Sequence, residues 1–308
     1  VKFNILQLYM TTYFGWFDYI IFVVYAALIL FVGLWVSRNK NGKQKSAEEY
    51  FLAGKTLPWW AIGASLIAAN ISAEQFIGMS GSGFSVGLAI ASYEWMAAIT
   101  LIIVGKYFLP IFIEKGIYTI PEFVEKRYST NLKTILAIFW IGLYVFVNIA
   151  SVLYLGALAL ETILDIPMVY GVIGLAFFAA AYSLYGGLAS VAWTDVIQVI
   201  FLLLGGLVTT YLALNTVSGG EGFFAGLETI YERTPSSFQM ILDESNPEYK
   251  NLPGIAVLVG GMWVANLYYW GFNQYIIQRT LAAKSLKESQ KGILFAAVLK
   301  LFIPLIVV

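Results

Sequence analysis

The chain has 308 residues, of which 60% are hydrophobic and 12% charged, with 18 basic and 18 acidic side chains and neither His nor Cys. A soluble domain carries about twice that share of charge, because charged residues cover its water-facing surface. The composition therefore predicts an integral membrane protein. The absence of His and Cys excludes thiolate zinc sites, imidazole metal ligation and a Ser-His-Asp triad. A net charge of zero gives no reason to expect a nucleic-acid partner.

Eight apolar runs approach the roughly 20 residues that a membrane-spanning helix needs. In chain order they are 19–36, 58–80, 84–113, 134–160, 168–185, 192–214, 254–278 and 292–308. We expect each run to cross the membrane once, with a short turn over 186–191 and a longer loop over 215–253. Between the third and fourth runs, Thr119 followed by Pro121 and Glu122 predicts the start of a short helix at the membrane surface.

The positions of Lys and Arg in the loops predict the orientation of the chain, because cytoplasmic loops carry an excess of both. With the N-terminus outside, 13 basic residues fall in inside loops: Arg38, Lys40, Lys43, Lys45, Lys55, Lys115, Lys126, Arg127, Lys133, Arg279, Lys284, Lys287 and Lys291. Lys2, Arg233 and Lys250 then lie outside, and Lys106 and Lys300 lie within runs. We therefore expect eight crossings with the N-terminus and the C-terminal end of the chain outside.

A polar segment interrupts the second run near its middle, where residues 70–75 read Asn-Ile-Ser-Ala-Glu-Gln. Small and polar residues with glycines after them weaken a continuous helix, and a break at membrane depth frees carbonyl oxygens that can coordinate sodium. The other interpretation is that Asn70, Ser72 and Gln75 hydrogen-bond to neighbouring helices. The glycines are not followed by Lys and Ser or Thr, so they do not indicate a phosphate-binding loop.

Glu94 and Lys300 are charged residues within apolar runs, and each is a candidate functional residue for that reason. Glu94, between Tyr93 and Trp95, could accept two hydrogen bonds from the hydroxyls of a neutral sugar. It could instead pair with Lys300 or Lys106, although twelve helical residues separate it from Lys106 by about 18 Å. Lys300 lies too deep for easy snorkelling, which favours a buried donor aimed at a cavity; an ion pair with Glu94 is the competing interpretation.

Aromatic and amide side chains are mixed over 263–274, where a lipid-facing helix would show Leu and Val. Rings with polar edges, together with amides, suit an uncharged, polyhydroxylated ligand. An interfacial aromatic belt is the alternative. Belts lie at helix ends, however, and Tyr269 lies well inside this run, so we favour binding. Asp195, near the inside end of the sixth run, is expected to cap its helix, or alternatively to attract a cation.

Residues 185–198, Tyr-Gly-Gly-Leu-Ala-Ser-Val-Ala-Trp-Thr-Asp-Val-Ile-Gln, resemble the signature of the sodium:solute symporter family. Residues 70–75, 93–95 and 263–278 closely resemble a bacterial, sugar-transporting member, and the similarity extends from about residue 17 to the end. The resemblance implies an all-α polytopic membrane protein with a LeuT-type inverted-repeat transporter fold, which is incomplete here. Within a single domain, 1–308, it implies an extra N-terminal helix (19–36), a first five-helix repeat (58–214), an extracellular loop (215–253) and the start of the second repeat (254–308).

The resemblance also implies roles for individual residues. Those that match sugar hydrogen-bonding groups are Gln75, Glu94, Asn266 and Lys300. Tyr269 matches an aromatic residue that stacks on the sugar and closes its inner side, with Trp270 beside it, and Met79 and Tyr93 match residues that cover the outer side. Sodium would be held partly by the backbone carbonyls of Ala68 and Ile71, with its other ligands outside this chain, and Asp195 would lie on the sodium exit route. Ala97 departs from the pattern, because the related sugar symporter has a ligand-contacting Ser there.

The function implied by the resemblance is sodium-coupled symport of a neutral hexose, galactose or glucose, by alternating access and without enzymatic chemistry. The implied partners are the sugar, Na+ as coupling ion and membrane lipid, in a bacterial inner membrane. Two alternatives stay open: a sodium symporter for an amino acid or carboxylate, with Lys300 as counter-charge, and a non-transporting sugar sensor. We do not expect these 308 residues to transport on their own.

Overall fold

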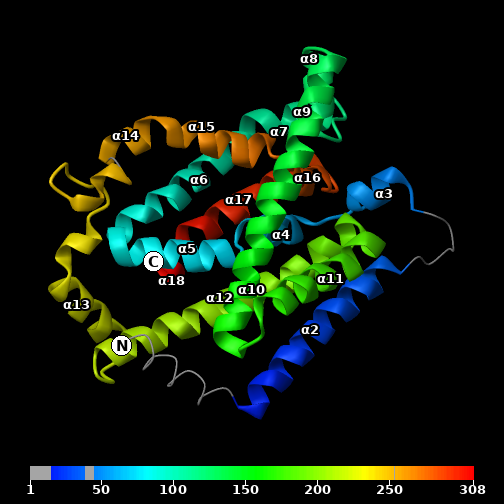
Figure 1. Cartoon of the computed structure of the whole chain (residues 1–308). Helices are drawn as coiled ribbons and strands as arrows, with labels where there is room; N and C mark the ends of the chain where they lie inside the picture. Colours follow the sequence, from blue (N-terminus) through cyan, green and yellow to red (C-terminus); the bar gives the residue numbers. More distant parts are fainter. Residues whose placement is uncertain (1–14, 39–44, 253) are drawn as a thin grey trace.

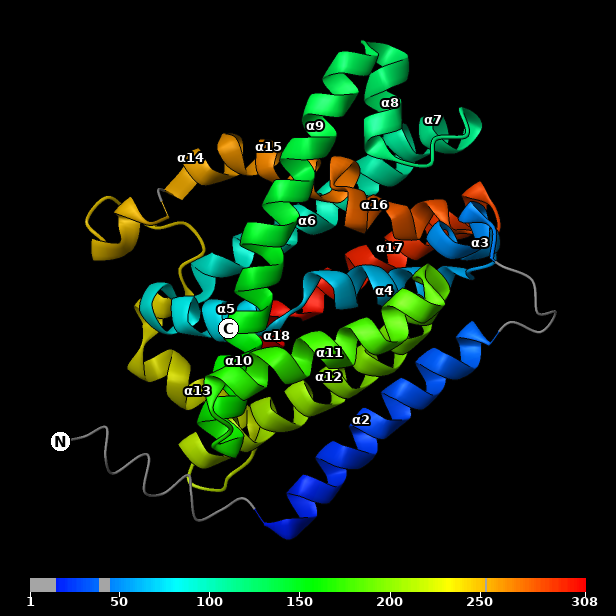
Figure 2. The same ribbon diagram turned by 45° about the vertical axis from the view of Figure 1, so that its right-hand side comes forward.

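The computed structural model describes residues 15–38, 45–252 and 254–308. These residues form helices joined by turns, with an isolated β-bridge between Leu57 and Ala283. Figures 1 and 2 show the long helices packed around two central ones, α4 (Trp59–Asn70) and α17 (Leu286–Phe302). The helical class predicted from the sequence is therefore confirmed for the described part of the chain.

Helix α4 forms the centre of the molecule because it is apolar or small on every face. Its residues 61–67 are all buried, and it packs against α17, α12 (Leu188–Val217) and α16 (Gln274–Leu281). Gly63 allows the close approach of α17, since a Cβ at this position would lie 2.8 Å from the carbonyl oxygen of Gly292. Small residues commonly permit such contacts between membrane helices.

The outer helices expose apolar side chains, as expected of surfaces that face lipid. Helix α2 (Trp16–Ser37) lies along the outside of α11 (Met168–Gly186) and α12 in both views (Figures 1 and 2). In the described part of the chain, six helical stretches are long and apolar enough to cross a membrane, or seven if one bent pair counts as a span. They are Trp16–Ser37, Gln75–Glu114, Thr130–Leu164, Met168–Gly186, Leu188–Val217 and Leu286–Val307, with Pro247–Val259 and Gly261–Phe272 as the bent pair.

The second predicted run is divided, as the polar segment indicated. Helix α4 ends at Asn70, Ile71 and Ser72 adopt extended backbone conformations, and α5 (Ala73–Val86) begins after them. This run is therefore not one uninterrupted helix, because two short helices meet at a break near its middle. We call residues Ile71 and Ser72 the helix break.

At two of the predicted boundaries that differ from the structure, a glycine with positive φ explains the difference. Helix α5 continues past the predicted start at 84, and the chain turns at Gly87 (φ 80°) through the 3-10 turn Gly87–Ala91 into α6 (Ser92–Ile103). A Cβ at Gly87 would lie 2.4 Å from the carbonyl oxygen of Ser237. Likewise, the predicted turn over 186–191 shrinks to Gly187 (φ 64°), because α11 ends at Gly186 and α12 begins at Leu188.

The remaining elements extend or subdivide the predicted runs. After α6 come a π-helical turn, Val104–Phe108, and α7 (Leu109–Glu114). Helix α9 (Thr130–Leu143) continues through a second π-helical turn, Tyr144–Ile149, into α10 (Ala150–Leu164). The region 215–253 contains α13 (Phe223–Arg233) and the 3-10 turns Pro235–Phe238 and Pro247–Lys250. It is followed by α14 (Gly254–Val259), α15 (Gly261–Leu267), the π-helical turn Tyr268–Phe272 and α16. Helix α17 starts at 286 rather than 292, and α18 (Pro304–Val307) follows it.

The short helix predicted after Thr119 is confirmed as α8 (Ile120–Arg127), with the Thr119 hydroxyl accepting a hydrogen bond from the backbone N–H of Glu122 at 3.2 Å. In Figure 2, α8, α16 and α3 (Ala47–Phe51) lie toward one end of the molecule, and α13 lies toward the other. The Tyr118 hydroxyl, just before α8, donates to Glu48 of α3 at 2.8 Å. This hydrogen bond, with the charge of Lys55, lowers the pKa of Glu48.

The basic residues predicted to lie inside mostly belong to this same end, which contains α3, α8 and the start of α17. Lys2, Lys40 and Lys43 lie outside the described residues. Arg279 is a correction, because it does not lie in a loop: it belongs to α16 and is buried.

Candidate functional site

A buried lysine at the helix break organises the first candidate site. Lys300 of α17 has no exposed surface, and its ammonium group forms an ion pair with Glu94 of α6 and donates a hydrogen bond to the side-chain oxygen of Asn70 at the end of α4. Its Nζ also lies 5.3 Å from the ring centroid of Trp270, within range of a cation–π interaction. Three helices that are distant in sequence thus share one charged group.

Hydrogen bonds extend this arrangement to both sides. The Gln75 amide of α5 donates to the other carboxylate oxygen of Glu94 at 2.7 Å. The Asn70 amide donates to the Tyr269 hydroxyl at 3.1 Å, and the Tyr275 hydroxyl donates to the same oxygen at 3.0 Å. We call the group Asn70, Gln75, Glu94, Tyr269, Tyr275 and Lys300 the polar cluster.

The polar cluster decides between the interpretations that the sequence left open. Lys300 pairs with Glu94, so the expectation of a buried donor aimed at a cavity gives way to the competing ion pair. Lys106 is no partner of Glu94 here, because its Nζ lies over the ring of Tyr107, 5.2 Å from the centroid. Asn70 and Gln75 hydrogen-bond to residues of other helices, as the packing interpretation of 70–75 predicted. The helix break that the sodium-binding interpretation predicted is present as well.

The remaining predicted sugar-site residues lie around this cluster with different degrees of contact. Met79 is buried, with its sulfur 3.2 Å from the Gln75 amide nitrogen. Trp270 is buried edge-to-face against Tyr269, with ring centroids 5.1 Å apart. In the described part of the chain, no hydrogen bond joins Asn266 or Tyr93 to the cluster: Asn266 donates to the Met262 carbonyl of its own helix, and Tyr93 is 42% exposed.

Local backbone geometry positions the aromatic residues. Tyr269 and Trp270 belong to the π-helical turn Tyr268–Phe272, which is held between α15 and α16. Single π-helical turns re-aim side chains and frequently occur at functional sites. The neighbouring Tyr268 stacks on Trp140 with ring centroids 4.9 Å apart, which anchors the turn against α9.

A cavity lies on the other side of the helix break and is the second candidate site. Its volume is about 540 Å³, and its walls include Ala68 and Ile71 of the break region, Gln198 and Val199 of α12, and Ile306 of α18. The last carbonyl groups of α4 have no further helical turn to bond to. Both predicted sodium-binding residues therefore line the same cavity, where carbonyl oxygens are the ligand type that sodium prefers.

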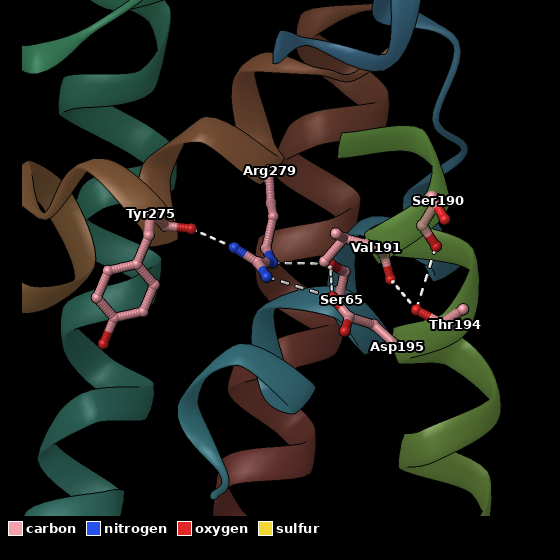
Figure 3. Close-up of polar contacts among 7 residues, drawn as sticks. All are labelled: Ser65, Ser190, Val191, Thr194, Asp195, Tyr275 and Arg279. Atoms are coloured by element: carbon pink, nitrogen blue, oxygen red, sulfur yellow. Dashed lines mark hydrogen bonds and ion pairs between the residues drawn. The ribbon is translucent and has the colours of Figure 1, made fainter. Parts of the chain in front are cut away.

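Asp195 does not cap α12, so the favoured prediction for this residue is wrong. Gly187 precedes the first residue of α12, and Asp195 lies beyond its first two turns, buried against α4 and α16. Ser65 donates to its carboxylate at 2.5 Å, and Arg279 pairs with the same oxygen at 3.3 Å while also donating to Ser65 at 2.8 Å (Figure 3). We call Ser65, Asp195 and Arg279 the ion-pair cluster. Arg279 was missed because it directly follows an apolar run and was assigned to a loop; the need of a buried carboxylate for a cation was the available signal.

The fold and both clusters define a class of protein: a polytopic helical membrane protein with a broken central helix and charged groups at membrane depth, which is typical of secondary transporters. The model of the sodium:solute symporter family matches residues 50–308, and the chain belongs to this family. The prediction of a transporter rather than an enzyme agrees with that membership.

Known relatives share most of this chain but extend further. The chain is 72% identical over 291 residues to a sodium/glucose cotransporter of Vibrio parahaemolyticus, a match that covers 94% of the chain and 54% of that relative. It is 34% identical over 295 residues to the human sodium/myo-inositol cotransporter 2, covering 92% of the chain and 43% of that relative. The chain thus spans about half the length of the curated relatives it matches.

A solved structure of a Na+-coupled sialic acid symporter in a substrate-bound, outward-open state is similar in fold. The TM-score is 0.80 at 26% sequence identity, with 95% of this chain and 60% of that one covered. The predicted LeuT-type transporter fold is confirmed by this similarity for the part of the fold that the chain contains.

Proposed function

We propose that this chain forms the sugar- and sodium-binding part of a sodium-coupled symporter for a neutral hexose, galactose or glucose. The observation that carries the proposal is the polar cluster, in which a buried ion pair and two amides meet at a break in the central helix. The 72% identity to a sodium/glucose cotransporter supports the same substrate class.

The charge of the polar cluster favours an uncharged solute. Lys300 and Glu94 neutralise each other, so the cluster offers donors and acceptors without a net charge. Sugar hydroxyls both donate and accept, and they can replace the bonds that Gln75 and Asn70 make within the cluster. A carboxylate or amino acid would need a counter-charge that is not already paired, which makes these substrates a poorer fit.

The proposed roles follow from position. Glu94 and Asn266 hydrogen-bond the sugar, supported by Gln75 and Lys300, and Tyr269 stacks on the ring and closes its inner side with Trp270. Met79 and Tyr93 cover the outer side. Asn266 and Tyr93 make no hydrogen bond within the cluster, so their polar groups are not occupied by it.

Sodium occupies the cavity at the helix break, on the carbonyls of Ala68 and Ile71, with its other ligands supplied from outside this chain. Its binding stabilises the break in the conformation that accepts sugar, so the two solutes bind together and cross by alternating access. Asp195 lies on the route by which sodium leaves.

The proposed location is a bacterial inner membrane with the N-terminus outside, residues 215–253 external and the α3, α8 and α16 end facing the cytoplasm. The excess of Lys and Arg at that end supports this orientation. Within this scheme the inverted repeat begins with 58–214 and continues with 254–308, and 19–36 is an additional helix.

The proposal is tested by sodium-dependent uptake of labelled galactose into vesicles that contain the full-length protein. We expect uptake in sodium but not in choline buffer, its loss in Glu94→Ala and Tyr269→Ala, and wild-type uptake in Glu228→Gln, an exposed carboxylate of α13. Persistence of uptake in the first two variants would refute the site assignment. Sugar binding without sugar-evoked current would instead identify a non-transporting sensor.

A further inference from the structure

The ion-pair cluster holds three helices together at one point. Arg279 comes from α16, Asp195 from α12 and Ser65 from α4, and all three residues are less than a tenth exposed. Figure 3 shows the guanidinium group of Arg279 between Ser65 and Asp195 on one side and the backbone of Tyr275 on the other. The Ser65 hydroxyl accepts from Arg279 and donates to Asp195, so each residue contacts the other two.

The attraction within a buried ion pair of this kind is strong when water is excluded and weak when water reaches the two charges. Removing one partner leaves an uncompensated buried charge, which is strongly destabilising, but water that reaches both partners restores their hydration and screens their attraction. The link between α16 and the other two helices therefore depends on the exclusion of water. A contact with this property can separate when helices move apart and close again when they return.

The ion-pair cluster lies about one helical turn from residues that line the cavity at the helix break. Ala68, Gln198 and Val199 line the cavity, and Ser65 and Asp195 precede them by three or four residues on the same helix faces. Ser65 lies about 9 Å along the helix axis from Ile71. Ser65 is closer than Ile71 to the start of α4. Just before that start, Leu57 pairs with Ala283, which follows the end of α16. This is the end of the molecule with α3 and α8, which our proposed topology places in the cytoplasm.

Tyr275 connects the same cluster to the candidate sugar site. Its backbone carbonyl accepts a hydrogen bond from the Arg279 guanidinium, and its hydroxyl donates to Tyr269 at 3.0 Å. Tyr275 and Arg279 are one helical turn apart on α16. Tyr275 thus contacts both Tyr269 of the polar cluster and the Arg279 guanidinium.

We infer that Arg279 is a positioning residue that latches α16 to α4 and α12, closes the cavity at its cytoplasmic end, and must separate from Asp195 before that end opens. The inference rests on the proposed transport function. It goes beyond that function by naming the contact that has to break when the cytoplasmic end opens. Separation also frees the Asp195 carboxylate from its guanidinium partner, so a cation leaving the helix break meets an unpaired acceptor.

Access to the cavity from the cytoplasmic end tests the latch. This chain contains no Cys, so Val199→Cys, at a buried position on the cavity wall, provides a single reporter once any cysteine elsewhere in the full-length protein is replaced by Ser. The measured quantity is the rate at which a membrane-impermeant maleimide labels this cysteine in inside-out vesicles, with neither sugar nor sodium present.

The variants are chosen so that misfolding cannot imitate opening. Arg279→Gln alone leaves Asp195 buried without its cation, so the main variant is the double change Asp195→Asn with Arg279→Gln, which removes both charges and keeps polar groups. Arg279→Lys retains the charge, and Lys287→Gln makes the same charge change at an exposed residue of α17. Thermal unfolding in detergent identifies any variant that has lost its fold.

We expect labelling to be roughly tenfold faster in the double variant, slightly faster in Arg279→Lys and unchanged in Lys287→Gln. Exchange of the charges, Asp195→Arg with Arg279→Asp, should restore slow labelling. Equal rates in the folded double variant and the wild type would overturn the latch. Because labelling is measured without transport, a protein that fails to take up galactose can still support the latch, and a protein that transports normally can still refute it.

Discussion

Two of the ion pairs in the described part of the chain are buried, Lys300–Glu94 and Arg279–Asp195, and their surroundings differ. Lys300 and Glu94 are flanked by the amides of Asn70 and Gln75, groups that can exchange one hydrogen-bonding partner for another. The Arg279 and Asp195 pair is completed by a serine hydroxyl and a backbone carbonyl. The surroundings of Lys300 and Glu94 therefore suit the binding of a ligand, whereas those of Arg279 and Asp195 suit the holding together of helices.

The largest expected effect is on the first pair. Glu94→Ala leaves Lys300 buried without a counter-charge, and we expect a loss of about 3–5 kcal/mol in stability together with loss of galactose binding. Thermal unfolding in detergent and equilibrium binding of labelled galactose measure the two effects. Adding Lys300→Met to Glu94→Ala should recover most of the stability but none of the binding. Recovered binding would show that the pair is purely structural.

The second pair should show the same pattern in stability as the first but a different effect on galactose binding. Arg279→Gln alone should destabilise the protein by about 3–5 kcal/mol, because Asp195 stays buried and charged, whereas Asp195→Asn with Arg279→Gln should cost far less. Galactose affinity should survive in the double variant, since neither side chain belongs to the polar cluster. Loss of sugar binding in a stable double variant would remove the distinction between the two pairs.

The clusters were predictable from the sequence to different degrees. Eight crossings were predicted from hydropathy, and the described part of the chain has six helical stretches of spanning length, or seven with the bent pair. The small and polar residues of 70–75 located the helix break. Glu94 and Lys300 were recognisable because charge at membrane depth is costly. They lie 206 positions apart in the sequence. The choice between an ion pair and a donor aimed at a cavity therefore required the packing of α17 against α4 and α6.

Arg279 shows where sequence patterns fail. It directly follows an apolar run, and nothing in its local pattern distinguishes a buried residue of a short helix from a loop residue that faces water. The π-helical turns Val104–Phe108, Tyr144–Ile149 and Tyr268–Phe272 were also invisible, because a single wider turn leaves the apolar pattern of a run unchanged.

A smaller effect is expected at the aromatic gate. Tyr269→Phe keeps the ring for stacking but removes the hydroxyl that accepts from Asn70 and Tyr275. These bonds hold the ring in its orientation; because a hydrogen bond is worth about 1 kcal/mol net, losing that orientation should lower galactose affinity by up to about fivefold. Binding titrations measure this, with Tyr268→Phe, the neighbouring tyrosine stacked on Trp140, as the control that should change little.

Ala97→Ser should strengthen binding by a comparable amount. Ala97 is buried on α6 three residues after Glu94, and therefore on the same face of the helix. A hydroxyl there can contribute about 1 kcal/mol, or up to roughly fivefold in affinity. Ala157→Ser, at a fully buried alanine of α10, is the matched control. Equal effects of the two changes would argue against a sugar beside Glu94.

The smallest effect is expected at the surface. Thr119→Ala removes the side-chain cap of α8 and should cost about 1 kcal/mol of stability. No hydrogen bond or ion pair joins α8 to either cluster in the described part of the chain, so sodium-dependent uptake should be unchanged once expression is matched. A fall in uptake per folded molecule would show that α8 itself takes part in transport, which the latch at Arg279 does not require.

Equilibrium binding of labelled galactose to the purified full-length protein, in sodium and in choline, tests the central claim most directly. The wild type should bind galactose in sodium and weakly in choline. The variant Glu94→Gln, which keeps the size of the side chain but not its charge, should show no sodium-dependent binding. Equal binding by this variant and the wild type would contradict the assignment of the polar cluster as the sugar site.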